Sequence, residues 1–87
     1  MANIEQQKRR IRRSRVQRER NLNYRSSIKT LFRSVSAAAE AGDAEELATG
    51  ARELEQLLDR SAARGVIHRN SAARKKRRLS QILAGAS

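Results

Sequence analysis

The placement of helix-breaking residues constrains the fold of this chain more than any other feature. Its 87 residues include no proline, and its four glycines stand at positions 42, 50, 65 and 85. Because proline and glycine are the residues that most often interrupt regular structure, the sequence predicts long helical tracts separated near Gly42 and Gly65. The predicted helices cover residues 8–40, 44–63 and 68–84.

Apolar residues within each tract recur at the i, i+3, i+4, i+7 spacing of one buried helix face. The stripe of the first tract consists of Tyr24, Ile28, Leu31, Phe32, Val35, Ala38 and Ala39. The stripes of the second and third tracts consist of Leu47, Ala51, Leu54 and Leu58, and of Ala72, Leu79, Ile82 and Leu83. No such helix can bury its stripe alone, so the sequence predicts an all-α fold, an antiparallel three-helix bundle. Ser26, Lys29 and Arg33 are expected on the face of the first helix that lies opposite its stripe.

Residues at the expected helix boundaries are suited to capping. Gly42 fits the position just after a helix C-terminus, and Asp43 with Glu46 three residues later predicts an N-cap with a capping-box partner. Gly65 is expected to end the second helix. Gly50 costs about 1 kcal/mol relative to alanine in a helix interior. Close approach of a neighbouring helix and plain tolerance explain this glycine equally well at the level of sequence.

The core stripe of the first helix fades in its N-terminal half, where polar Gln17 and Asn21 occupy its continuation. The apolar residues of this half lie on a different side of the helix, at Ile4, Ile11 and Leu22. This half has no core to join, so it is expected to project. The chain is predicted to form a single domain of residues 1–87, with a bundle at about 23–84 and a projecting basic helix at about 1–22.

The formal net charge of +11 predicts a polyanionic partner. Residues 1–33 hold eleven bases and two acids, residues 40–59 hold seven acids and one base, and residues 60–87 hold eight bases and no acid. The acidic middle must face away from a polyanion, so the bound surface is expected to come from the two basic ends. Nucleic acid is the first partner that this layout indicates.

Two basic segments are the candidate binding elements. Residues 8–25, KRRIRRSRVQRERNLNYR, place bases on nearly every side of a helix, whereas a helix that lies on a membrane segregates a broad apolar face. The second segment is RKKRR at residues 74–78, in which Lys75 lies within the apolar stripe. The residues of the third helix that point away from this stripe are Asn70, Arg74, Arg77 and Gln81.

No catalytic, cofactor or metal site is predicted. The chain has no cysteine, and its one histidine, His68, falls in line with Ala72 and Leu79 on the apolar side of the third helix. A packed or helix-capping role is expected there, because one imidazole with scattered carboxylates makes no ligand set. The sequence contains no apolar run long enough for a membrane span and no secretory signal, while its basic segments leave a mitochondrial transit peptide or a nuclear signal open.

The small number of aromatic residues bears on the kind of nucleic acid that would be bound. Tyr24 and Phe32 are the only two, and proteins that read single-stranded RNA usually offer several aromatic faces. The expected mode is therefore contact with the phosphates and 2′-OH groups of a folded, mostly helical RNA. Compaction of DNA would use the same charges.

Four stretches of the chain carry a family pattern. They are MANI at residues 1–4, RNLNYRSSIKT at 20–30, AAEAGD at 38–43 and DRSAARGVIHRNSAARKKRRLS at 59–80. The last is the most specific, with Lys/Arg-Gly-x-Ile-His-Lys/Arg-Asn followed by Ala-Ala-Arg and a basic helix. Over almost its full length the chain resembles the bacterial small-subunit ribosomal protein family numbered twenty. The resemblance implies a three-helix bundle with an extended first helix, and a non-enzymatic constituent of the bacterial, cytoplasmic small ribosomal subunit that supports RNA folding and assembly.

By position, the resemblance implies RNA contacts at Lys8, Arg9, Arg10, Arg12, Arg13, Arg15, Arg18, Arg20, Asn21, Arg25, Ser26, Lys29, Arg64, His68, Arg69, Asn70, Arg74 and Arg77. Small-subunit ribosomal RNA is then the partner, other small-subunit components are candidate neighbours, and no membrane, small-molecule substrate, cofactor or homo-oligomer is expected. The chain departs from the family pattern at Glu5, Gln6 and Gln7, which weakens phosphate contact at the extreme N-terminus. The alternatives are a histone-like protein that binds DNA or RNA without specificity and, less favoured, a helical module for a protein partner.

Overall fold

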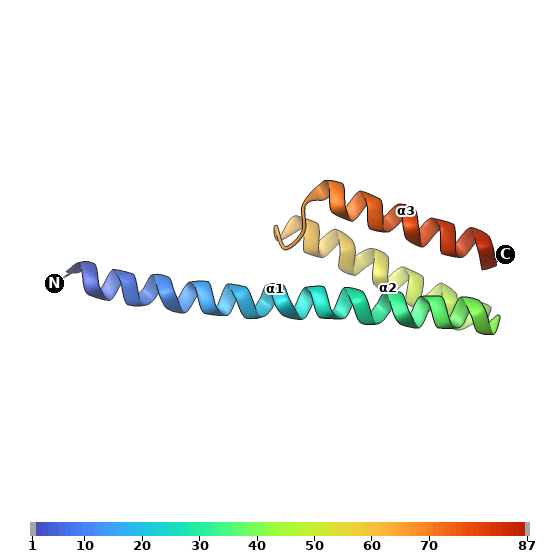
Figure 1. The fold of residues 1–87 in the computed structure, drawn as a ribbon, viewed down its shortest axis with the longest axis horizontal. Coiled ribbons are helices and arrows are strands. Elements are labelled where there is room, and N and C mark those ends of the chain that lie inside the picture. Colours follow the sequence, from blue (N-terminus) through green and yellow to red (C-terminus); the bar gives the residue numbers. More distant parts are fainter. Residues whose placement is uncertain (1, 87) are drawn as a thin grey trace.

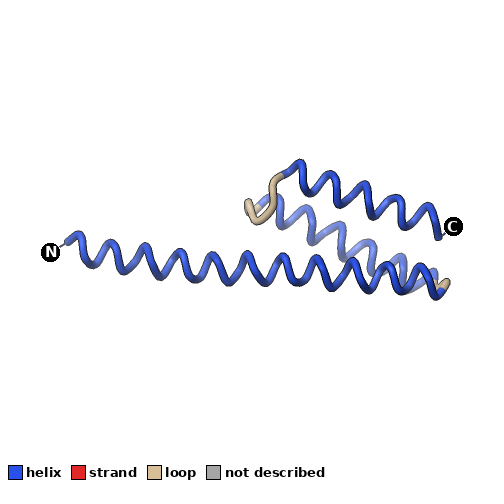
Figure 2. Tube along the Cα trace, viewed as in Figure 1, coloured by secondary structure: helices blue, strands red, loops and turns tan. Residues whose placement is uncertain are grey.

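Three helices make up the fold. The computed structural model describes the backbone of residues 2–86 and the side chains of residues 4–86. Met1 and Ser87, which the predicted single domain includes, lie outside the described residues. In the described part α1 spans Ala2–Ala41, α2 spans Ala44–Ala63 and α3 spans Arg69–Ala86. Figures 1 and 2 show α2 running back along the C-terminal half of α1 and α3 reversing direction again. The predicted all-α, antiparallel three-helix bundle is confirmed.

The helix bounds agree with the prediction to within two residues except at the start of α1, which begins six residues earlier than the expected residue 8. The expected start was placed where the basic run begins. Residues 2–7, ANIEQQ, contain neither proline nor glycine, so nothing in the sequence ends the helix before that point.

The turn between α1 and α2 is a Schellman motif followed directly by an N-cap. Gly42 has a φ of 72°, its N–H donates to the Ala39 carbonyl at 3.3 Å, and the N–H of Asp43 donates to the Ala38 carbonyl at 3.0 Å. The Asp43 carboxylate then accepts from the Glu46 N–H at 3.1 Å, as the N-cap prediction requires. The predicted capping-box role of the Glu46 side chain is wrong. In a capping box this side chain would accept a hydrogen bond from the Asp43 N–H, but that N–H already donates to the Ala38 carbonyl in the Schellman motif.

A second Schellman motif ends α2 at the predicted glycine. Gly65 has a φ of 74° and donates its N–H to the Ala62 carbonyl at 3.1 Å, while Val66 donates to the Ser61 carbonyl at 2.9 Å. Val66 is buried beneath this turn. The Ser61 side chain is also buried, and its hydroxyl donates to the Leu57 carbonyl at 2.7 Å, so no polar atom is left unpaired there.

The apolar stripes of the three helices form one core, as predicted. Its buried members are Ile28, Phe32, Val35, Ala38, Leu47, Ala51, Leu54, Leu58 and Leu79. The placement of Leu83 in the α3 stripe is wrong, since this residue is 36% exposed. At about 100° per residue, Leu83 and half-buried Ile82 lie on opposite sides of Leu79, and the core is on the side of Ile82.

Gly50 lies where α2 packs closely against α1. A Cβ atom built at this position would stand 3.2 Å from the Cγ2 atom of Val35, which is tighter than an ordinary contact between carbon atoms. Val35 is fully buried. Of the two explanations that the sequence left open, close approach of a neighbouring helix is the one that the structure supports.

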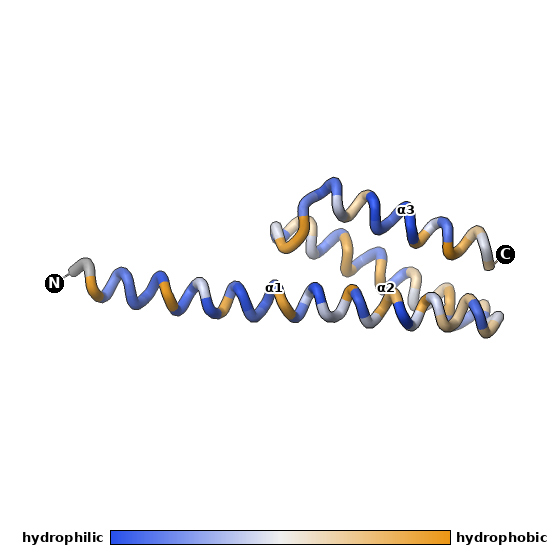
Figure 3. Tube along the Cα trace, viewed as in Figure 1, coloured by the Kyte–Doolittle hydropathy of each residue, from blue (hydrophilic) through white to orange (hydrophobic). Residues whose placement is uncertain are grey.

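The N-terminal half of α1 extends beyond the bundle. The side chains of residues 4–20 are exposed, and the first half-buried residue is Asn21. The molecule measures 63 × 21 × 13 Å, and its radius of gyration is 17.3 Å, compared with about 12 Å for a compact domain of this length. Figure 1 shows this half of α1 without a neighbour, and Figure 3 shows it hydrophilic except at isolated positions. The extended first helix is therefore confirmed.

Candidate nucleic-acid interface

The projecting half of α1 presents positive charge in every direction. All eight Lys and Arg side chains between residues 8 and 20 are exposed. The exposed apolar side chains of this region are Ile4, Ile11, Val16 and Leu22. Ile4, Ile11 and Leu22 follow a single line along the helix, since their spacings of seven and eleven residues return to nearly the same angle. A line one residue wide is too narrow for a membrane-binding face. Charged side chains therefore make up most of the exposed surface of this half of α1.

A hollow lies where α1 leaves the bundle. Its lining includes Arg12, Arg13 and Arg20 from α1 together with Arg64 from the end of α2. The guanidinium carbon of Arg64 stands 5.8 Å from the centroid of the Tyr24 ring. The α2–α3 turn thus adds an arginine to those of α1, and it does so near the half-buried Asn21. The structure brings together residues that the sequence predicted separately.

His68 caps the start of α3. Its Nδ1 atom accepts from the Asn70 N–H at 3.1 Å, and its carbonyl accepts from the Ala72 N–H at 3.0 Å. An accepting Nδ1 carries no proton, so the imidazole proton is on Nε2. The helix-capping role expected for this residue is confirmed, but its placement on the apolar side of α3 is wrong. The helix begins at Arg69, so helical periodicity does not apply to His68, and the side chain is exposed.

The outward line predicted along α3 is present. Asn70, Arg74, Arg77 and Gln81 are all exposed. Arg74 donates to the Ser71 hydroxyl at 3.0 Å, which holds its guanidinium along the helix surface. With His68 and Arg69 before them, these residues form a polar row along α3.

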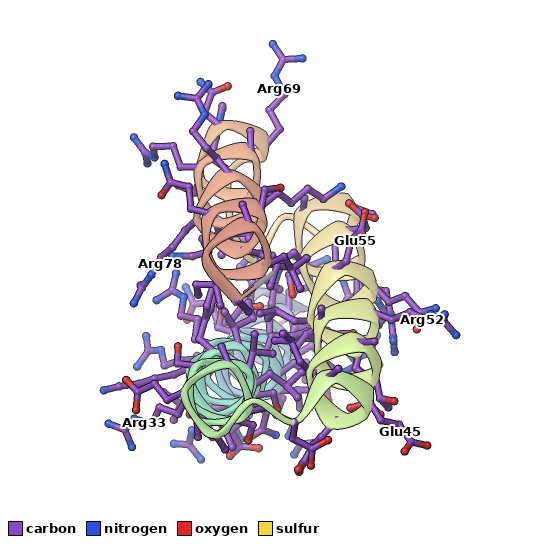
Figure 4. The ribbon with its side chains drawn as sticks, turned by 90° about the vertical axis from the view of Figure 1, so that its right-hand side faces the viewer. Arg33, Glu45, Arg52, Glu55, Arg69 and Arg78 are labelled. Carbon is purple, nitrogen blue, oxygen red and sulfur yellow. The ribbon has the colours of Figure 1, made fainter. Side chains whose placement is uncertain are left out.

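A groove runs between α1 and α3. Arg25, Lys29 and Arg33 of α1 line it, as do Lys75 and Arg78 of α3, and Glu40 is the one carboxylate in its lining. Its apolar floor consists of Ile28, Phe32 and Ile67. Figure 4 shows Arg33 and Arg78 projecting from the two helices on the same side of the molecule. Lys29 and Arg33 are exposed, as expected for residues off the core stripe, and they line this groove because α3 packs beside the stripe of α1.

Arg78 is the functional candidate that the sequence prediction missed. Its guanidinium carbon lies 5.0 Å from the centroid of the Phe32 ring, within the range of a cation–π contact. The RKKRR run indicated that bases gather here, but only the packing of α3 on α1 reveals which of them meets an aromatic ring.

Acidic residues of α2 lie on a different face from this groove. Figure 4 shows Glu45 and Glu55 of α2 on the side of the molecule away from Arg33 and Arg78. Asp59 of α2 forms an ion pair with Lys76 of α3. The hydrogen bond that Lys76 donates to Asp59, together with the charges of Asp59 and Glu55, raises the pKa of Lys76 above its ordinary value, although partial burial opposes this. Lys76 is therefore engaged within the fold.

The described residues hold no arrangement typical of a metal centre or a membrane span. Among residues 2–86, no three His, Cys, Asp or Glu side chains lie together where they could share a metal ion. Over the same residues, no helix combines the length and the apolar character that a bilayer crossing requires.

Known proteins match this chain over most of its length. The family model of ribosomal protein S20 matches residues 2–84. The chain is 43% identical over 84 residues to small ribosomal subunit protein bS20 of Kocuria rhizophila, covering 97% of this chain and 98% of that protein. It is 44% identical over 79 residues to the protein of the same name from Nocardia farcinica, covering 91% and 92%. The Photobacterium profundum protein of that name is 43% identical over 79 residues, with the same coverage.

Proposed function

This chain belongs to the ribosomal protein S20 family, and we propose that it is a structural, non-enzymatic constituent of the small ribosomal subunit that binds small-subunit ribosomal RNA directly. The observation that carries the proposal is the separation of charge over the surface. Basic side chains cover the projecting half of α1, the hollow at its base and two sides of α3, while the carboxylates of α2 face elsewhere. Such a layout suits a protein embedded among phosphates on several sides.

The proposed contacts are mainly with the RNA backbone. Arginine supplies sixteen of the twenty basic residues, and its planar guanidinium binds a phosphate through two parallel hydrogen bonds. All eighteen residues proposed from the family pattern reach the surface, with Asn21 alone half-buried. The Nε2–H of His68 is available to donate to an RNA acceptor while Nδ1 caps α3. Contacts of this kind fix position and orientation, and the folded shape of the RNA then supplies the specificity.

The proposal includes the state in which the protein works. It acts in the bacterial cytoplasm as one copy within the ribosome, as a single domain whose bundle at about residues 23–84 carries the projecting helix. The length of that helix lets it lie between RNA segments while the bundle rests against their outer side. By neutralising phosphates where RNA segments pack together, the protein supports their folding and assembly.

Competition between RNAs at several salt concentrations tests this function. The full chain is titrated with small-subunit ribosomal RNA and with a random duplex of equal length. Binding to the duplex should fall by about 10³ to 10⁵ between 50 and 200 mM salt if six to ten phosphates are contacted. The ribosomal RNA should keep an advantage at every salt concentration, because shape-specific contacts survive the release of counterions. Equal binding of both RNAs throughout would instead indicate a histone-like protein without specificity.

A further inference from the structure

Each of the two aromatic rings of this chain carries an arginine. Arg78 lies over Phe32 at 5.0 Å, and Arg64 lies over Tyr24 at 5.8 Å. A guanidinium that rests on a ring loses little further freedom when it binds a ligand, and its planar outer face stays in a fixed orientation. The chain thus holds two arginines in place before any ligand binds. Arg64 stands in the hollow at the base of the projecting helix, and Arg78 stands in the groove between α1 and α3, whose lining includes Ile28, Phe32 and Ile67.

The lining of the α1–α3 groove differs from that of a site for phosphates alone. Its floor is formed by Ile28, Phe32 and Ile67, against which a phosphate would lose hydration without gaining a partner. Its edges carry cations from both helices, so negative charge is favoured there. Among the described side chains, no carboxylate forms an ion pair with Arg78. The groove therefore matches a ligand with an apolar planar face and negative charge at its two sides.

We propose that this groove binds one unpaired nucleotide of RNA, with its base stacked on the outer face of Arg78 and its flanking phosphates held by Lys29, Arg33 and Lys75. Unstacked bases stack on arginine planes as they do on aromatic rings, so a protein with two aromatic residues can still receive a base. The inference rests on the proposed RNA-binding function and deepens it. It adds Arg78 as a residue that contacts a base, whereas the other proposed contacts of the protein are mainly with the RNA backbone.

The test compares probes that differ only in their bases. The full chain is titrated at 50 mM salt with hexariboadenylate and with an abasic oligomer of the same length and phosphate number. One stacked base should give the adenylate a roughly 5- to 150-fold advantage. Arg78→Lys keeps the charge and removes the plane, so it should abolish this advantage while leaving the affinity for the abasic oligomer unchanged. Phe32→Leu, checked for helicity, should reduce the advantage because Arg78 is no longer supported.

The matched control is Arg52→Lys, an exposed arginine of α2 on the far side of the molecule, which should retain the full advantage of the adenylate. Equal binding of both oligomers by the unaltered chain, or an advantage that persists in Arg78→Lys, would overturn the proposal. So would a polyglutamate peptide that binds the unaltered chain but not Arg78→Lys, while both proteins bind the RNA probes equally well, since the groove would then bind an acidic protein segment.

A parallel titration with small-subunit ribosomal RNA and a random duplex separates this inference from the function on which it rests. If the ribosomal RNA keeps its advantage and the oligomers show no dependence on bases, only the groove assignment fails. If the ribosomal RNA has no advantage, the proposed function fails whatever the oligomers show.

Discussion

Replacing Gly50 with alanine tests whether this glycine sets the spacing between α1 and α2. Two effects oppose each other. Alanine gains about 1 kcal/mol of helix propensity over glycine in a helix interior. The added methyl group would stand 3.2 Å from Val35 Cγ2, several tenths of an ångström inside an ordinary carbon–carbon contact. Val35 is 0% exposed, and a valine in a helix has one strongly preferred rotamer, so its methyl group cannot turn aside.

The steric effect should be the larger of the two. Adding a methyl group to a packed core costs about 1–3 kcal/mol, so a value near 2 leaves a net loss of about 1 kcal/mol in the free energy of unfolding. For a domain of this size that corresponds to a melting temperature lowered by about 4–8 °C. In a Val35→Ala background the obstructing methyl group is gone. There the same Gly50→Ala change should stabilise the fold by about 1 kcal/mol, which is a coupling energy of about 2 kcal/mol.

Urea and thermal unfolding of the four proteins of this double-mutant cycle, followed by circular dichroism at 222 nm, measure both quantities. The far-ultraviolet signal is suitable because every element of the fold is helical. A Gly50→Ala protein that gains about 1 kcal/mol in the unaltered background, with no coupling to position 35, would refute the reasoning. Gly50 would then be a tolerated helix glycine, and the interface between α1 and α2 would accommodate a methyl group at this position.

Removing residues 1–20 should leave the unfolding midpoint of the bundle nearly unchanged and weaken RNA binding strongly, since none of the described side chains up to residue 20 is buried; loss of the cooperative transition would contradict this. His68→Ala should cost about 0.5–2 kcal/mol of stability through the lost cap on Asn70, and His68→Asn should restore most of it; equal stability of both variants would contradict the capping role. Asp59→Asn should lower stability by at most about 1 kcal/mol near pH 8, because the pair with Lys76 is exposed. The pKa of Lys76 is raised above its ordinary 10.5, so this contribution is present below that pH and is lost as the pH rises through the folded-state pKa. A variant difference that grows in unfolding titrations above pH 10.5 would contradict the pairing.

Much of the fold could be predicted because its signals are local. Helical periodicity identified the buried faces of α1 and α2, and the glycines at 42 and 65 located both turns. The stretch at residues 59–80 carried the family resemblance, which the match of the S20 family model confirms. These features depend on residues that are close to one another along the chain.

The errors arose where the chain leaves a helix or where two helices meet. Val66 is buried in a turn, where helical periodicity gives no signal, and His68 stands one residue before α3 begins. The contact between Arg78 and Phe32 depends on how α3 is rotated and shifted along α1, which neither helix specifies by itself. The candidate groove is therefore a product of packing, whereas the projecting half of α1 could be predicted from the sequence alone.

The projecting half of α1 also determines the order in which parts of the protein contact a polyanionic partner. Its seventeen exposed residues at positions 4–20 extend about 25 Å, roughly three times the distance of about 8 Å over which charges are felt at physiological ionic strength. The tip of α1 therefore meets an approaching polyanion outside the electrostatic field of the bundle. First capture and final docking become separate events, and the long helix widens the target for collision while the bundle fixes the final orientation.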